Sequence, residues 1–210
     1  MTQWISQYCR IKTIFGIIAL LSFSGCATMT QHSDLSKVKF TLDYISDVSV
    51  AGINLMHIQS PEDLNMFQVA RATLAVSREN LPLNLTLHLK SENPLANRVA
   101  AKLIRIDWTL VLDGRDTVSG TMHNNIKLNA GEVESIPLSL SLNMFEYFNE
   151  KSAMDMLDLA LAFAGSDGAI PQGVALKVRP TIDTIFGPIT YGKGILIEPR
   201  PKEPTQERFI

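Results

Sequence analysis

Cysteine is almost missing from this chain: its 210 residues include only two, Cys9 and Cys26. Cys9 lies in an N-terminal apolar segment that we expect to be removed, which would leave Cys26 as the one thiol of the mature chain. This scarcity excludes a disulfide framework, a thiol nucleophile and a cysteine-based metal site.

An excess of positive charge is also missing, since 19 Lys and Arg stand against 21 Asp and Glu, a formal net charge of −2. Removing residues 1–25 takes away Arg10 and Lys12 and leaves 17 basic residues, a net charge of −4. Such a surface has no electrostatic footprint for nucleic acid and does not favour anionic lipid headgroups. The 46% hydrophobic content instead indicates one packed globular domain.

Long hydrophobic runs are missing too. The apolar run from Ile14 to Phe23 is shorter than the ~20 residues that a spanning helix needs. With Arg10 and Lys12 before it, the run is typical of a secretory signal peptide. It ends in Ser24-Gly25-Cys26, which resembles a bacterial lipoprotein signal; an uncleaved anchor or an ordinary secretory peptide are the alternatives.

The lipoprotein interpretation predicts cleavage before Cys26 and covalent lipid on this residue, which would hold the protein at a membrane. Residue 27 is Ala, whereas lipoproteins retained in the inner membrane often have Asp at this position. By this resemblance we expect the outer membrane of a Gram-negative bacterium. Apart from the covalent lipid on Cys26, no cofactor is expected.

Catalytic and metal-binding motifs are missing as well. His32, His57, His88 and His123 have neither the spacing of a zinc helix nor a flanking glutamate in such a pattern. Phosphate loops, dinucleotide fingerprints and nucleophile elbows do not occur. We therefore predict no catalytic residue, no metal site and no enzymatic activity.

Alternating apolar and polar residues predict antiparallel strands. Leu83, Leu85, Leu87 and Leu89 give the clearest example, and Pro137 suggests an edge strand or a bulge. A slip in the first strand, near Ile45 and Ser46, suggests a bend or a bulge. We expect about seven strands in a β-sandwich, over 38–50, 83–89, 104–112, 117–128, 136–142, 174–178 and the short runs 189–191 and 195–197.

Two inserted helices are expected. Ser60-Pro61-Glu62-Asp63 is a strong helix start for a segment that runs to about Ser77. A second helix is predicted over 144–164, with Ser152 and Asp155 forming a capping box and Gly165 a stop.

The second helix is apolar almost all round. Either the two helices complete the core, or they line a groove for an acyl chain or a hydrophobic partner. The candidate groove residues are Met154, Met156, Leu157, Leu161 and Phe163.

Several motifs together resemble the late-embryogenesis-abundant type 2 family, also called the WHy domain. They are Leu81 to Leu87, Asn93-Pro94, the apolar strand from Ile106 through Trp108 to Asp113-Gly114, Gly120, Ile136-Pro137-Leu138 and Gly194 to Ile197. The resemblance implies a seven-stranded sandwich related to fibronectin type III domains and a role under water stress. We assign Asn93, Pro94, Trp108 and Gly120 structural roles, and the two helices exceed the minimal domain of the family.

The expected organisation is a signal peptide (1–25), a tether (26–36), the sandwich domain (37–198) and a disordered tail (199–210). Two functions fit best. One is a non-enzymatic, lipid-anchored envelope protein with a protective or adaptor role, and the other is a module that binds lipid or an envelope protein at the 144–164 helix. An enzyme whose pocket gathers residues from distant strands is the third class.

Overall fold

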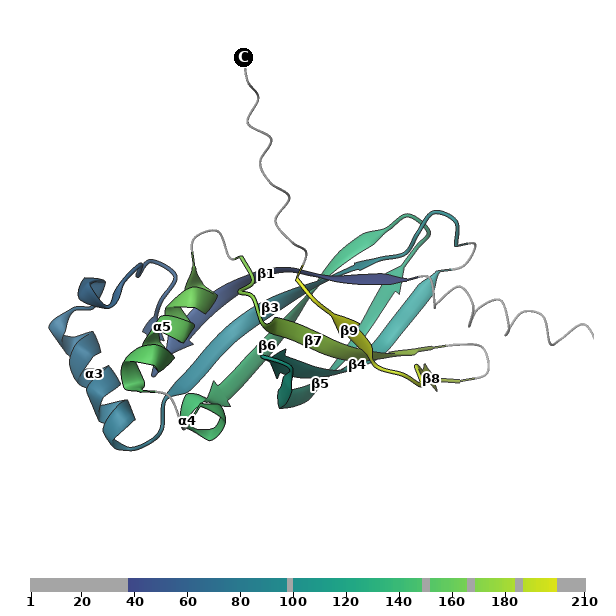
Figure 1. The fold of residues 1–210 in the computed structure, drawn as a ribbon. Helices are drawn as coiled ribbons and strands as arrows, with labels where there is room; N and C mark the ends of the chain where they lie inside the picture. Colours follow the sequence, from purple (N-terminus) through teal and green to yellow (C-terminus); the bar gives the residue numbers. More distant parts are fainter. Residues whose placement is uncertain (1–37, 98–99, 149–151, 166–168, 184–186, 200–210) are drawn as a thin grey trace, which may run out of the picture.

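The computed structural model describes residues 38–97, 100–148, 152–165, 169–183 and 187–199. The predicted signal peptide, Cys26, the tether with His32, and residues 200–210 of the tail lie outside these residues. Within them the chain folds into two antiparallel sheets with helices at one end (Figure 1). The predicted mainly β architecture, a sandwich with a few helices, is confirmed.

The first sheet has the strand order β2-β1-β3-β6. Its strands are β1 (Lys39–Val50), β2 (Ile53–Asn54), β3 (Pro82–Glu92) and β6 (Val133–Asn143). Leu83, Leu85, Leu87 and Leu89 of β3 are all buried, as their strict alternation predicts. Among the strands that the structure describes, β6 pairs with β3 alone, so Pro137 lies on an edge strand, where a residue without an N–H is tolerated.

The second sheet has the order β5-β4-β7-β8, and β9 also pairs with β7. Its strands are β4 (Ala101–Leu112), β5 (Arg115–Leu128), β7 (Val174–Ile182), β8 (Ile189–Thr190) and β9 (Ile195–Ile197). β4 and β5 meet at the predicted Asp113-Gly114 turn, where both residues have positive φ, the geometry of a type I′ hairpin.

Register shifts interrupt two of the predicted strands, β1 and β4. β1 shifts register against β3 between Leu42 and Ile45 and again between Ser46 and Ser49, so the predicted irregularity is confirmed. The alternating pattern in the sequence predicts Ile104 on the same buried face of β4 as Ile106 and Trp108. This prediction is wrong, because Leu103 is buried in its place. The cause is a register shift between Leu103 and Arg105, which moves every residue before it to the other face.

The helix predicted from Ser60 to about Ser77 is wrong as a single element. Pro61–Asp63 forms a 3-10 turn, Leu64 is extended with ψ 127, and α3 (Met66–Ser77) begins only after it. Asn65 and Gln68 form a second capping box, in which the Asn65 side chain accepts from the Gln68 N–H. Because this box supplies its own start signal, the chain restarts a helix at Asn65 instead of continuing from Ser60.

The single helix predicted over 144–164 is also wrong. The structure has a short α4 (Met144–Tyr147) and a separate α5 (Ala153–Ala164). The predicted capping box of Ser152 and Asp155 is confirmed, as is the end of the helix at Gly165. α5 packs along β1 and closes the side of the sandwich there, while α3 lies beyond it at the end of the molecule (Figure 1).

Candidate functional site

The candidate site is an apolar groove between α3 and α5. Its volume is about 340 Å³, at the lower end of the range for ligand pockets, ~300–1,000 Å³. Its lining is apolar except for the hydroxyl of Thr73 and comprises Val50, Pro61, Leu64, Val69, Ala72, Thr73, Val76, Leu81, Ala153, Met154 and Leu157. Nothing in the lining is charged, so the groove suits an uncharged, apolar occupant.

The floor of the groove belongs to the first sheet. Val50 ends β1 and Leu81 precedes β3, and both side chains are buried. The backbone of Leu81 is fully engaged: its N–H donates to Asn143 Oδ1 at 3.0 Å, and its carbonyl accepts from the Met144 N–H at 3.0 Å. The floor therefore offers contact with side chains and no open backbone edge.

One wall of the groove is α3, which buries none of its residues. Val69, Thr73 and Val76 follow each other at helical spacing and face the groove. Met66, three residues before Val69, continues this stripe and is 84% exposed, whereas Phe67 lies on the opposite side of the helix and is 87% exposed. Fully burying such a side chain is worth about 1.5–3 kcal/mol. A ligand or partner that covered Met66 would therefore gain binding free energy.

The other wall is α5. The structure places Met154 and Leu157 on the groove, with Met154 58% exposed. Met156, Leu161 and Phe163 lie in the core of the domain, on the face of α5 that packs against β1. Of the five residues suggested by the sequence, two line the groove, and Val69, Thr73 and Leu81 line it without having been suggested. A wide apolar face on the segment before Ser77 was the available signal for Val69.

The charges near the groove are unevenly distributed. Glu62 and Asp63 lie on the 3-10 turn that adjoins Pro61 and Leu64, and Asp155 and Asp158 lie on α5. The Ser60 hydroxyl hydrogen-bonds to Glu62 and keeps its pKa below the ordinary value, so this carboxylate stays ionised.

The arginines of α3 and its C-terminal end do not line the groove. Arg71 and Arg78 line a different hollow, on the opposite flank of α3, together with Leu74 and Pro82. Arg71 Nη1 donates to the carbonyl of Gly52 at 3.3 Å. The groove therefore has no basic side chain in its lining, while the segments that line it carry carboxylates.

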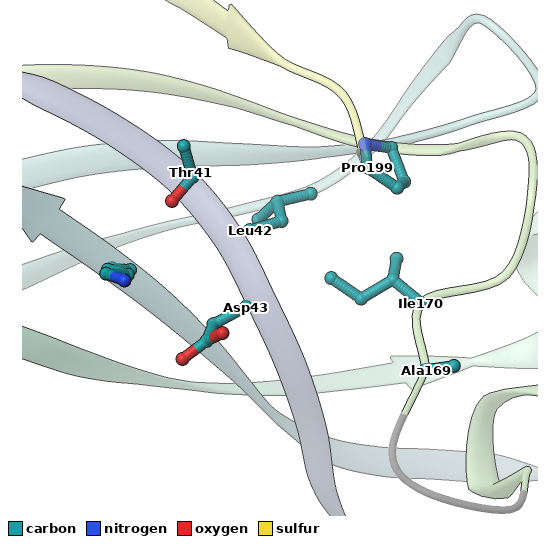
Figure 2. A pocket seen from close by; sticks show the side chains of 7 residues that line it. Thr41, Leu42, Asp43, Ala169, Ile170 and Pro199 are labelled. Carbon is teal, nitrogen blue, oxygen red and sulfur yellow. The ribbon is translucent and has the colours of Figure 1, made fainter. Parts of the chain in front are cut away.

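Another hollow, of about 280 Å³, lies against the N-terminal half of β1. In Figure 2, Leu42 and Ile170 point toward one another beneath Pro199, while Asp43 lies on the other side of β1. Lys90 also lines this space. Because charged side chains flank a small apolar patch, this hollow is less suited to an apolar ligand than the α3–α5 groove.

The motif residues assigned to structure lie away from the groove. Asn93 is fully buried; its Nδ2 donates to the Leu128 carbonyl at 2.9 Å, and its carbonyl accepts from the Gly131 N–H at 2.7 Å. Pro94 follows it and restricts its backbone to extended geometry. Trp108 and Gly120 form a cross-strand pair between β4 and β5.

Chemistry-bearing side chains do not converge in the described part of the chain. Across those ranges no group of three or more His, Cys, Asp or Glu residues could hold a metal ion. His88 stacks on Tyr44 with ring centroids 3.9 Å apart and shares a hydrogen bond with Ser46 at 3.0 Å. Likewise, no described helix has both the length and the apolar character to cross a bilayer.

Several solved structures are distantly similar to this chain. No family model and no curated protein sequence matches the chain. A crystal structure of a protein from Archaeoglobus fulgidus shares 12% identity and a TM-score of 0.34, over 76% of this chain and 90% of that one. The solution structure of a candidate late embryogenesis abundant protein shares 12% identity and a TM-score of 0.35, over 90% and 86%. Similarity this low transfers neither family membership nor function.

Proposed function

We propose that this chain is a non-enzymatic, lipid-anchored protein of the bacterial cell envelope that binds a hydrophobic ligand or partner in the α3–α5 groove. One observation carries the proposal: an apolar groove whose walls, at Val69 and Met154, remain open to solvent. Contiguous apolar surface on a soluble domain is typical of interaction sites.

The two sheets could form a packed core without the two helices, so the helices need a further explanation. Both sheets already supply a continuous core that includes Leu83, Leu89, Leu110 and Leu176. α5 adds to this core through Met156 and Phe163, whereas α3 adds only partly buried residues such as Ala72 and Val76. Because the larger apolar side chains of α3 stay exposed, we infer that this helix also contributes to binding.

The anchor and the absence of enzymatic activity complete the proposal. The segment ending in Ser24-Gly25-Cys26 supports lipid attachment at Cys26, with the outer membrane as its site. The groove has no charged lining and a single hydroxyl, that of Thr73, which supports binding over catalysis because acid-base chemistry needs titratable groups at the reacting atoms.

A protective role under water stress is the second candidate. It rests on the sequence motifs around Asn93-Pro94 and Trp108, which resemble the late-embryogenesis-abundant type 2 family. The test is to dry a sensitive enzyme in the presence of the full chain or of serum albumin. Better recovery with the chain supports this role, and equal recovery removes it.

Methyl NMR tests the binding proposal directly. The full chain, labelled at its methionine methyl groups and held in lipid nanodiscs, is titrated with decanol as an apolar probe. We expect the Met154 signal to shift in a saturable way and the Met122 signal, on β5, to stay in place.

A matched pair of variants supplies the control. Val69 and Val133 are 46% and 47% exposed, but Val69 lines the groove and Val133 starts β6 beside Glu92 at the other end of the first sheet. Val69→Lys should weaken decanol binding at least tenfold, whereas Val133→Lys should leave it unchanged. An unperturbed Met154, or equal loss in both variants, would rule the groove out as the binding site.

A further inference from the structure

We propose that the occupant of the α3–α5 groove is an amphipathic helix of a partner protein, with an apolar stripe flanked by basic residues. This inference rests on the proposed function and narrows it from any apolar ligand to one class of partner. The arguments are the extent of the exposed apolar surface, the engaged backbone of the groove floor, and the charges around it.

The apolar surface extends beyond the cavity. Met66 precedes Val69 by three residues and Thr73 by seven, so it continues their stripe on α3, yet it does not line the cavity and is 84% exposed. An occupant that fits inside 340 Å³ would leave Met66 in water. A helix about 10–12 Å across, laid along the groove, covers Met66 and inserts one or two side chains into the cavity between Met154 and Val69.

The backbone around the groove favours a helix over an added strand. A strand needs an open sheet edge, but Val50 is paired with Ile53 of β2 and Leu83 of β3. Leu81 uses its N–H and carbonyl on Asn143 and Met144. A helix satisfies its own backbone and needs only apolar contact, which is what this lining offers.

The charges near the groove predict which residues lie beside the apolar stripe of the partner helix. Four carboxylates, those of Glu62, Asp63, Asp155 and Asp158, lie on the segments that line it. Asp158 follows Met154 by one helical turn, so it borders the same stripe. Complementary charge predicts Lys or Arg beside the apolar stripe of the partner. The same border disfavours the free carboxylate of a fatty acid.

The groove also lies at the far end of the domain from the predicted anchor. β1 is 12 residues long; it begins at Lys39, paired with Glu92, and ends at Val50 on the groove floor, a distance of about 36 Å. The chain toward Cys26 leaves from the Lys39 end. An anchored domain can therefore present the groove away from its own bilayer, where a helix of another protein can reach it.

Two labelled peptides test the inference. Each has about 18 residues, or five helical turns, with leucines at i, i+3, i+4 and i+7; one has lysine flanks and the other has glutamate at the same places. Fluorescence anisotropy measures their binding to the full chain in zwitterionic nanodiscs, with empty nanodiscs as the baseline. We expect the lysine peptide to bind at least tenfold more tightly than the glutamate peptide.

Charge reversal then locates the contact. Asp158→Lys should weaken binding of the lysine peptide at least tenfold. Glu134→Lys makes the same charge change on exposed β6, at the opposite end of the first sheet, and should have no effect on binding of this peptide.

The remaining outcomes separate the two proposals. If decanol shifts Met154 but neither peptide binds, the groove holds a small apolar molecule such as an acyl chain, and the helix inference is overturned while the proposed function stands. If the glutamate peptide binds as well as the lysine peptide, the charge argument fails and the inference with it. If neither decanol nor a peptide binds, both proposals fail.

Discussion

The indole of Trp108 occupies the space that a side chain on Gly120 would fill. The two residues pair directly across β4 and β5, and a Cβ placed on Gly120 would overlap Cζ2 and Cε2 of the Trp108 ring. The tryptophan is nearly buried, because the bare glycine backbone opposite lets its ring lie flat on the neighbouring strand.

This contact predicts the effect of Gly120→Ala. The methyl group would displace the Trp108 ring, and we expect a loss of about 1–3 kcal/mol in the free energy of unfolding, together with a change in tryptophan fluorescence. Gly192→Ala is the control, since a Cβ there meets nothing within 4 Å. Urea denaturation measures both, and equal stability of the two variants would contradict the packing described here.

Asn93→Ala should destabilise the protein through lost hydrogen bonds. The side chain of Asn93 joins the end of β3 to Leu128 of β5 and accepts a hydrogen bond from the Asn97 amide. Removing it leaves buried polar groups without this partner, at a cost of about 1–3 kcal/mol. Asn84→Ala, on the outward face of the same strand, should cost much less. If thermal unfolding shows similar losses for both, the Asn93 network is not important for stability.

Asp107→Asn should make stability less dependent on acid pH. Partial burial acts to raise the pKa of Asp107, but hydrogen bonds from Thr121 and Arg105 and the charges of Arg105 and Arg179 outweigh it and lower the pKa overall. A lowered pKa in the folded state adds stability above the unfolded-state value, about 3.9, and this stability is lost as the pH falls through the folded-state value.

We therefore expect Asp107→Asn to be less stable than the parent by at most about 1 kcal/mol at neutral pH. The difference should shrink once the pH falls below about 4. Chemical denaturation across this range checks it, and a difference that grows toward acid pH would reverse the assigned sign.

The capping box of α5 links helix stability to binding. Ser152 accepts from the Asp155 N–H at 3.2 Å and donates to Asp155 Oδ2 at 2.7 Å. Ser152→Ala should cost about 1 kcal/mol and weaken decanol binding severalfold, because Ala153 and Met154 of the first turn line the groove. Ser152→Thr keeps a capping hydroxyl and should retain most of the affinity. Unchanged binding in Ser152→Ala would show that the groove does not depend on this turn.

Cys26→Ser tests the anchor. Cells fed a labelled fatty acid should incorporate the label into the parent chain and not into the variant, and fractionation should release the variant from the membrane. Uptake of label by Cys26→Ser would contradict the lipoprotein interpretation.

The sequence predicted those elements whose signals are local. The alternation of leucines from Leu83 to Leu89 lies within one strand, and the capping box of Ser152 and Asp155 lies within one helical turn. Both could therefore be predicted from the sequence of the segment alone. The break at Leu64 was missed because Ser60-Pro61 is the stronger start signal, although Asn65 and Gln68 already had the spacing of a second box.

The groove could be predicted only in part because it depends on how distant segments pack. α5 is apolar on nearly every face, so periodicity could not separate Met154, on the groove, from Met156, in the core. The register shift beside Leu103 likewise depends on pairing with β5 and β7. Neither signal is present in the segment alone.

The course of β1 also has a mechanical consequence. A pull between a tether ahead of Val38 and a partner held at Val50 would run lengthwise along β1, from one end of its ladder with β3 to the other. Interstrand hydrogen bonds in an antiparallel pair lie perpendicular to the strands, so such a load would shear many of them at once instead of peeling them apart singly. A domain loaded in this way would resist unfolding better than one that is pulled across its strands.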